Sequence, residues 1–428
     1  MSMESNKIPK EYSNEQEEEK KEFSFLQETI KSEQMTGRKL ASRITVIAVC
    51  GIFFGLMSCV GFFALKPWAE STFHQNTSKV TIPKDEEEKE PAKETEQVQT
   101  NNPAMTLTSH EQLNEALFEV AKKAERGVVE VRGIHGKEGW IEETYDTVNS
   151  VSGIIIADTG AEVLILADNS ILKDAESLNC TFCDGSTYSA EMKKQDKRLG
   201  IAIFSVKKAT LKSMTTRQMI TLKLGNSNLV TQGDTLIALG KPFGYSDAIS
   251  YGIASAVGKE ISFSDGDYRL ILSDIPGSRN GSGIFINTAG EVVGLIKPDL
   301  SGNEHISTTN ALAISDLKAE IELLSNGKSV SYIGITGAEI TAKIEKEQGF
   351  PQGLYVKNVE TDSPAMVAGI QCGDIITSVG RTKITTQDAY QNAILEYEPG
   401  TQIELSGKRR SNDGYAEIKF TVTVGGKE

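Results

Sequence analysis

The hydrophobic positions of the chain first form one uncharged run near the N-terminus. Residues 44–65 contain no charged side chain, and these 22 residues match the roughly 20 needed to cross a bilayer as a helix. A cleavable signal peptide would start closer to the N-terminus and have a shorter apolar core. The pattern therefore predicts one transmembrane helix over 44–65, preceded by a polar tail over 1–43.

Basic residues flank this run unequally. Arg38, Lys39 and Arg43 lie just before it, whereas Lys66 alone lies just after it. Because positive charge is enriched on the cytoplasmic side of membrane helices, we expect the polar tail in the cytoplasm. The rest of the chain would then lie outside the cell membrane, held to it by a single pass.

The segment after the apolar run, residues 66–110, has the composition of a linker. Its stretch KDEEEKEPAKETEQVQTNNPA has almost no large apolar side chain, so it cannot bury enough surface to fold by itself. We expect an extended stalk outside the membrane.

Alternating apolar positions begin after a short helical stretch. The segment EQLNEALFEVAKKAERG, which starts at residue 111, has helical spacing, and the segments after it alternate with a period of two. Turn signals such as Asp184-Gly185 separate these short strands. Residues 111–327 are therefore predicted to form an all-β barrel or sandwich, closed by a helix that ends near Gly327.

A second, smaller domain is predicted over residues 328–428. Its strand patterns surround a helix at about 386–397, and the segments IELSGKRR and AEIKFTVTV are its last two strands. About 100 residues suffice for an independent core. The chain is thus mainly β, with two folded domains behind its N-terminal segments.

Composition excludes some classes of function. The formal net charge of −14 argues against general nucleic-acid binding, which needs a basic surface.

The five cysteines are an odd, scattered set rather than a disulfide framework. Cys180 and Cys183 lie three residues apart on a predicted strand and would point to opposite faces. With no second pair of ligands in the sequence, we expect neither a metal site nor a cofactor.

The smaller domain contains four short motifs in a characteristic order. They are Tyr332-Ile333-Gly334-Ile335, Ser363-Pro364-Ala365, Ala368-Gly369-Ile370 and Gly373-Asp374-Ile375-Ile376. Together they resemble the PDZ domain of HtrA-type proteins.

This resemblance implies a peptide-binding groove. A glycine-containing turn leaves backbone N–H groups unpaired, and these can receive the terminal carboxylate of a peptide while the next strand edge pairs with its backbone. By resemblance, Tyr332, Ile333, Gly334 and Ile335 form the carboxylate loop, and the helix at 386–397 forms a wall of the groove.

The larger domain resembles the trypsin-like protease domain of the same family, a double β-barrel. The similar segments are SGIII at 152–156, IALGKPFG at 237–244, GIASA at 252–256 and the stretch 280–294. The family commonly forms trimers, so the resemblance implies a homotrimer or a mixed assembly with active relatives.

The catalytic triad of this family has no complete counterpart here. Ser170 stands where the family places histidine, and Gly200 stands where it places aspartate. Counting back from Asn287 puts Gly281 at the nucleophile, whereas counting forward from Ser273-Asp274 puts Ser282 there. Both registers remain open. A serine without a base is a weak nucleophile, so we interpret the domain as a pseudoprotease.

Other residues offer few substitutes for the missing base. His74, His110, His135 and His305 all lie away from the expected position of the base. A Ser–Lys dyad is the remaining catalytic alternative, with Ser282 as nucleophile and Lys241 or Lys297 as base.

Three functions follow from these observations. The first is a membrane-anchored protein that binds C-termini or extended, unfolded segments of envelope proteins, in quality control or as a regulator or scaffold of active proteases. The second is an active serine endopeptidase with an unusual base. The third is a structural membrane protein whose PDZ groove is closed.

Overall fold

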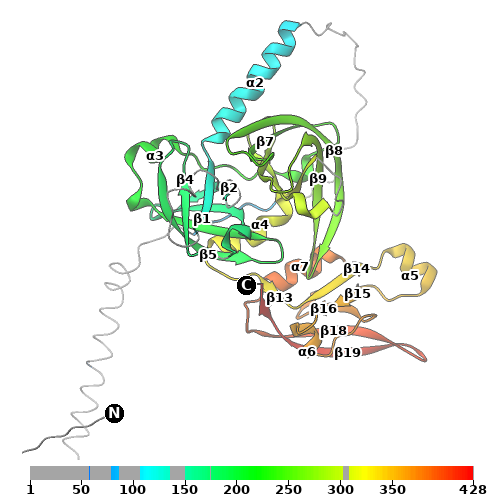
Figure 1. Cartoon of the computed structure of the whole chain (residues 1–428). Coiled ribbons are helices and arrows are strands. Elements are labelled where there is room, and N and C mark those ends of the chain that lie inside the picture. Colours follow the sequence, from blue (N-terminus) through cyan, green and yellow to red (C-terminus); the bar gives the residue numbers. More distant parts are fainter. Residues whose placement is uncertain are drawn as a thin grey trace, which may run out of the picture. The chain divides into compact units, whose positions relative to one another are not determined.

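The folded part of the chain belongs to one compact unit, residues 75–428 (Figure 1). The computed structural model describes Met57 and residues 79–85, 107–134, 150–173, 175–301 and 308–427.

Six antiparallel strands close the first barrel in the order β1-β2-β3-β6-β5-β4. Their bounds are β1 (Val128–Ile134), β2 (Ser150–Asp158), β3 (Glu162–Asp168), β4 (Ser177–Thr181), β5 (Thr187–Asp196) and β6 (Ile201–Lys207). The expected alternation is seen in β1, where Val129 and Val131 are buried and their neighbours are half-buried. The predicted turn at Asp184-Gly185 joins β4 to β5 and is confirmed.

The second barrel closes in the order β10-β11-β12-β9-β8-β7. Its strands are β7 (Thr235–Lys241), β8 (Ala248–Phe263), β9 (Gly266–Pro276), β10 (Ser282–Ile286), β11 (Val292–Ile296) and β12 (Thr308–Ala313). Strands β10 and β11 are buried along their whole length, because each is covered on both faces. The expected double β-barrel is thereby confirmed.

Helices are few in this part of the chain. They are α2 (Leu107–Glu125), η2 (Asn169–Leu172), η3 (Lys208–Thr210), α3 (Ser213–Gln218), η4 (Ser227–Leu229), η5 (Pro298–Ser301) and α4 (Ile314–Ser325). Helix α4 is the predicted closing helix. Its apolar side chains, Leu317 and Ile321 among them, enter a core cluster that contains residues of both barrels. The helix ends before Gly327, whose φ of +72° is the left-handed conformation typical of a helix C-terminus.

The C-terminal domain has its own core, formed by residues of a sheet and two helices. Its sheet has the order β14-β15-β16-β18-β19, and β13 pairs with β20 alone. The strands are β13 (Ser331–Tyr332), β14 (Ile335–Glu339), β15 (Leu354–Val359), β16 (Ile375–Val379), β17 (Thr382–Lys383), β18 (Gln402–Ser411), β19 (Gly414–Thr423) and β20 (Gly425–Gly426). The helices are α5 (Ala342–Gln348), α6 (Pro364–Val367) and α7 (Gln387–Leu395), the last at the predicted position.

The N-terminal predictions are tested only in part. The predicted transmembrane segment 44–65 lies outside the described residues except for Met57. No helix within the described ranges is long and apolar enough to cross a membrane.

A short part of the predicted linker packs on the folded domain. The N–H of Val80 donates to Asn326 at 3.1 Å, and the ammonium of Lys318 pairs with Asp85 at 2.8 Å. Residues 79–85 therefore lie along α4. The linker-like composition of residues 66–110 did not indicate this packing, because the partners are far away in sequence.

Candidate functional site

Ser282, one of the two residues considered for the nucleophile, is the first residue of β10 and pairs with Lys241 of β7. Its hydroxyl oxygen accepts a hydrogen bond of 2.9 Å from the backbone N–H of Ser152 in β2, and only 4% of the residue is exposed. Ser282 therefore links the two barrels, with its hydroxyl buried against a backbone amide.

Gly281, the other candidate, occupies a position where a side chain does not fit. A Cβ atom there would lie 2.5 Å from the carbonyl oxygen of Pro242 and 2.8 Å from that of Ser278. Both distances are closer than van der Waals contact allows. In neither register do the described residues present an exposed hydroxyl at the position of the nucleophile.

Ser170, at the position predicted for the base, lies in η2 directly after β3. The carboxylate of Asp168 caps this turn by accepting the N–H of Ser170 at 2.8 Å. The side chain of Ser170 is exposed. A serine hydroxyl is not a proton acceptor of useful strength near neutral pH, so it cannot replace an imidazole as general base.

A lysine ammonium lies against Gly200, the position predicted for the triad acid. Gly200 has a φ of +67°, and a Cβ atom added to it would overlap Nζ of Lys297. That ammonium donates to Asp168 at 2.6 Å and to the carbonyl oxygen of Gly200 at 3.0 Å. The Lys297 side chain is only 5% exposed. A carboxylate on residue 200 would therefore require this lysine to move.

Lys241 has a different partner from the one suggested by the sequence. Its ammonium donates to the hydroxyl of Ser150 at 2.9 Å and to the backbone oxygen of Ser150 at 3.2 Å. Burial lowers the pKa of Lys241, with Glu130 opposing the shift. The ammonium bonds given above for Lys241 and Lys297 go to Ser150, Asp168 and Gly200. The Ser150–Lys241 pair was missed by sequence analysis because no family motif marks it.

Histidine is represented by one residue among those the structure describes. His110 lies on α2, and its Nδ1 is 3.1 Å from the amide nitrogen of Asn114. His74, His135 and His305 lie outside the described residues.

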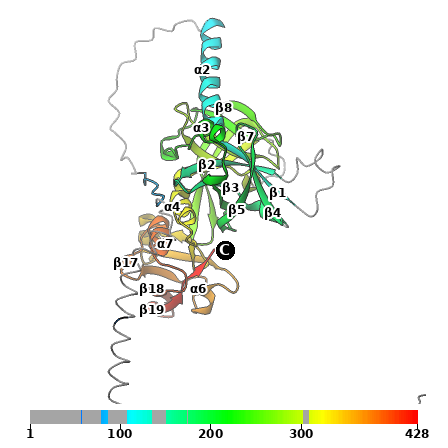
Figure 2. The same cartoon turned by 90° about the vertical axis from the view of Figure 1, so that its left-hand side faces the viewer.

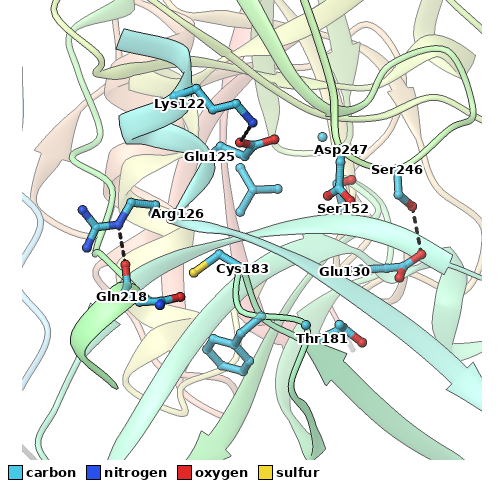
Figure 3. A pocket seen from close by; sticks show the side chains of 14 residues that line it. Lys122, Glu125, Arg126, Glu130, Ser152, Thr181, Cys183, Gln218, Ser246 and Asp247 are labelled. Atoms are coloured by element: carbon cyan, nitrogen blue, oxygen red, sulfur yellow. Dashed lines mark hydrogen bonds and ion pairs between the residues drawn. The ribbon is translucent and has the colours of Figure 1, made fainter. Parts of the chain in front are cut away.

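A pocket of about 610 Å³ opens between α2, β1 and the turn after β4 (Figure 3). Ser152 contributes to its lining, and Lys122 pairs with Glu125 at 2.6 Å on its α2 side. Cys183 is exposed and unbridged there, and burial followed by the charge of Asp184 raises its thiol pKa. Because the thiol stays protonated at neutral pH, Cys183 is not an activated nucleophile.

The loop predicted to bind a carboxylate surrounds one. The N–H groups of Ile333 and Gly334 donate to Oδ2 of Asp265 at 2.8 and 2.7 Å, and the N–H of Ile335 donates to Oδ1 at 3.0 Å. The Tyr390 hydroxyl of α7 donates to Oδ1 at 2.6 Å. Three consecutive amides thus converge on one carboxylate, which belongs to the same chain.

Gly334 is required at the centre of the loop. Its φ is +93°, and a Cβ atom there would overlap the side chain of Ser363. Ile333 and Ile335 are fully buried in the core of the domain, which fixes the direction of the amides between them. The loop is therefore held by packing on both sides.

Tyr332 plays a different part from its three neighbours. Its backbone pairs with Gly425 of β20, and its ring lies under the guanidinium of Arg198 at 3.4 Å from the ring centroid. Burial and then the hydrogen bond to Glu360 raise the pKa of Tyr332 to about 12. Arg198 also pairs with Glu360 at 2.6 Å, and it lies two residues before Gly200. This contact links the carboxylate loop to the turn that contains Gly200.

One edge of β14 has no strand partner among the described residues. In the described part of the chain, β14 pairs only with β15, so its other edge is unpaired beyond Ile335. An extended peptide can add to such an edge. Helix α7 makes close contacts with β14, and so stands beside this strand.

Comparisons with known proteins agree with this architecture. The family model of the trypsin-like peptidase domain matches residues 151–295, and that of the PDZ domain matches residues 331–420. A "Probable periplasmic serine endoprotease DegP-like" of Pseudomonas savastanoi pv. phaseolicola is 29% identical over 288 residues, which are 65% of this chain and 56% of that protein. A "Serine protease Do-like HtrA" of Lactobacillus helveticus is 23% identical over 300 residues, 64% of this chain and 69% of that protein.

A solved structure shows the same fold. The HtrA-type protease AlgW with a tripeptide superposes with a TM-score of 0.51 at 20% identity, over 72% of this chain and 96% of that chain. The chain spans between about half and two-thirds of the two curated relatives described above. From its two matched domains and these likenesses, the chain has a trypsin-like peptidase domain followed by a PDZ domain, and it is similar to HtrA-type serine proteases.

Proposed function

We propose that this HtrA-like protein is a pseudoprotease that captures the C-termini or extended segments of other proteins through its PDZ domain. The convergence of the Ile333, Gly334 and Ile335 amides on one carboxylate is the observation that carries this proposal. Beside it, the unpaired edge of β14 would take the backbone of the ligand.

The loss of catalysis is supported by the three triad positions. Gly200 lacks a carboxylate and has the Lys297 ammonium against it, and Ser170 lacks a basic nitrogen. Ser282 has a hydroxyl, but it is buried against the amide of Ser152. Removing the triad of a serine protease lowers kcat by about a million-fold, so we expect no measurable proteolysis.

Location and assembly extend the proposal. The uncharged run 44–65 and the basic residues before it support a single-pass anchor with the folded domains outside the cell membrane. The curated relative from Pseudomonas is named periplasmic, which agrees with an extracytoplasmic place. There the protein would bind unfolded envelope proteins, as a homotrimer or with active relatives that it regulates.

An active endopeptidase is the competing function, because the curated relatives are named serine proteases. A fluorophosphonate probe and a casein assay, applied to the full chain and to Ser282→Ala, distinguish the two. We expect no labelling and no cleavage with either protein. Labelling and cleavage that disappear in Ser282→Ala would show that Ser282 is a working nucleophile.

Peptide capture is tested with fluorescein-labelled decapeptides that end in valine. We expect the free-acid peptides to bind and the matching C-terminal amides to bind at least about tenfold more weakly, because the amide removes the charged acceptor. Equal binding of acid and amide would contradict a carboxylate-reading groove.

A further inference from the structure

The carboxylate inside the PDZ loop comes from the peptidase domain of the same chain. Asp265 is the second residue of the two-residue turn between β8 and β9, a hairpin of the second barrel. Helix α7 lies beside the end of this hairpin (Figure 1 and Figure 2). Asp265 is 2% exposed, and its two oxygens accept four hydrogen bonds, three from the loop and one from Tyr390. The carboxylate is therefore buried and fully bonded.

The backbone of Asp265 extends the same pattern. Its N–H donates to the carbonyl oxygen of Ile335 at 2.7 Å, at the start of the unpaired edge of β14. A strand added to this edge would make its first backbone bond at this oxygen and would place its terminal carboxylate among the three amides. Asp265 thus supplies a carboxylate and a backbone N–H, the two groups that the last residue of a bound peptide would supply.

The turn itself does not require an aspartate. Asp265 has a φ of +64°, a left-handed conformation that glycine adopts without steric cost and that other residues adopt rarely. All four acceptor bonds of its carboxylate go to the PDZ domain, and none goes to its own hairpin. The bonds to the PDZ loop, and not the geometry of the turn, account for an aspartate at this position.

We propose that Asp265 is an internal ligand of the PDZ domain, which a peptide C-terminus must displace in order to bind. This inference rests on the proposed peptide-binding function. Two carboxylates cannot share the same three amides, because the donors are already used and the charges repel. The rest of the β14 edge stays available, so an incoming peptide can pair there before its carboxylate replaces that of Asp265. Binding would then release the β8–β9 hairpin from α7 and the loop.

The substitution Asp265→Asn tests this exchange with little change of shape. Asparagine tolerates the left-handed conformation, but one of its two terminal atoms becomes an NH2 donor. At Oδ2 this donor would face the amides of Ile333 and Gly334, and at Oδ1 it would face the amide of Ile335 and the Tyr390 hydroxyl. Either orientation opposes donors to donors and weakens the contact.

Asp247 provides a matched control. It stands just before β8, at the other end of the strand from Asp265, and it also has a left-handed φ, of 56°. Asp247 is exposed and lines the pocket beside α2. Asp247→Asn makes the same chemical change in a similar turn without touching the PDZ loop.

Amide hydrogen exchange of the full chain without peptide measures the contact directly. We expect the segment that contains residues 333–335 to exchange at least about tenfold faster in Asp265→Asn, because its amides lose their charged acceptor. Asp247→Asn should exchange like the unmodified chain. An unchanged exchange rate of residues 333–335 in Asp265→Asn would overturn the proposal that Asp265 is an internal ligand.

Binding of the valine-ended free-acid decapeptides measures the competition. Removing an internal competitor raises the fraction of molecules that can bind, so Asp265→Asn should bind these peptides about tenfold or more tightly than the unmodified chain and Asp247→Asn. Equal affinities of the three proteins would overturn the proposed competition between Asp265 and the peptide C-terminus. If none of the three binds while Asp265→Asn still exchanges faster, the proposed peptide-binding function fails and the internal contact is a fixed domain junction.

Discussion

The ion pair between Lys297 and Asp168, beside Gly200, makes the sharpest prediction about the peptidase domain. The Lys297 ammonium is 2.6 Å from the Asp168 carboxylate, with side chains 5% and 20% exposed. Asp168→Asn leaves the ammonium buried with the carbonyl oxygen of Gly200 as its remaining acceptor among the bonds described above. The expected result is a large loss of stability of the domain.

The magnitude follows from the burial of the two groups. Breaking a buried ion pair by removing one partner costs about 3–5 kcal/mol, because the other charge is left uncompensated. Water reaches Asp168 in part, so we expect about 3 kcal/mol. For a domain of this size, each kcal/mol lowers Tm by about 2–4 °C. Asp168→Asn should therefore lower the Tm of the peptidase domain by about 6–12 °C.

A double-mutant cycle separates the ion pair from other effects. Lys297→Met removes the buried charge and keeps the apolar stem, so we expect it to cost about 1 kcal/mol, and the double variant should regain most of what Asp168→Asn loses. Thermal unfolding of the four proteins, followed by scanning calorimetry, measures this coupling. A Tm loss below about 2 °C for Asp168→Asn, or strictly additive losses, would refute the view that Lys297 is held at the acid position by Asp168.

Two further predictions concern buried carboxylates elsewhere. Burial raises the pKa of Glu320, so the folded state holds this proton more tightly, and stability should fall as pH rises from about 4.5 through the raised pKa. Glu320→Gln should abolish that fall and raise the free energy of unfolding by about 1–3 kcal/mol at pH 7. Melting curves between pH 4 and 8 measure both effects. A pH dependence equal to that of the unmodified chain would contradict this prediction. Asp374 is 1% exposed and pairs with Arg409 through bonds of 2.6 and 2.7 Å. Asp374→Asn should lower the free energy of unfolding of the PDZ domain by about 2–3 kcal/mol. The exposed control Asp413→Asn should lower it by less than about 0.5 kcal/mol. Equal melting temperatures for these two variants would contradict the assigned role of Asp374.

The sequence was sufficient for features that are encoded over a few residues. Alternating apolar positions and turn residues such as Asp184-Gly185 indicated the strands and hairpins, because side-chain direction in a strand repeats every two residues. The order of the short motifs from Tyr332 onward indicated the PDZ domain, and the absence of histidine at Ser170 was readable directly. The packing of residues 79–85 along α4 was not indicated, since composition describes a segment and not its partners.

The long-range contacts at the two sites were decided by tertiary structure alone. Asp265 is 70 residues away from Ile335, and Lys297 is 97 residues away from Gly200. Periodicity shows which face of a strand is buried, but it does not show which distant group meets that face. Only closure of the barrels brings Lys297 against Gly200, and only the packing of a hairpin against α7 fills the carboxylate loop. These contacts depend on how finished elements pack, and no local pattern records that.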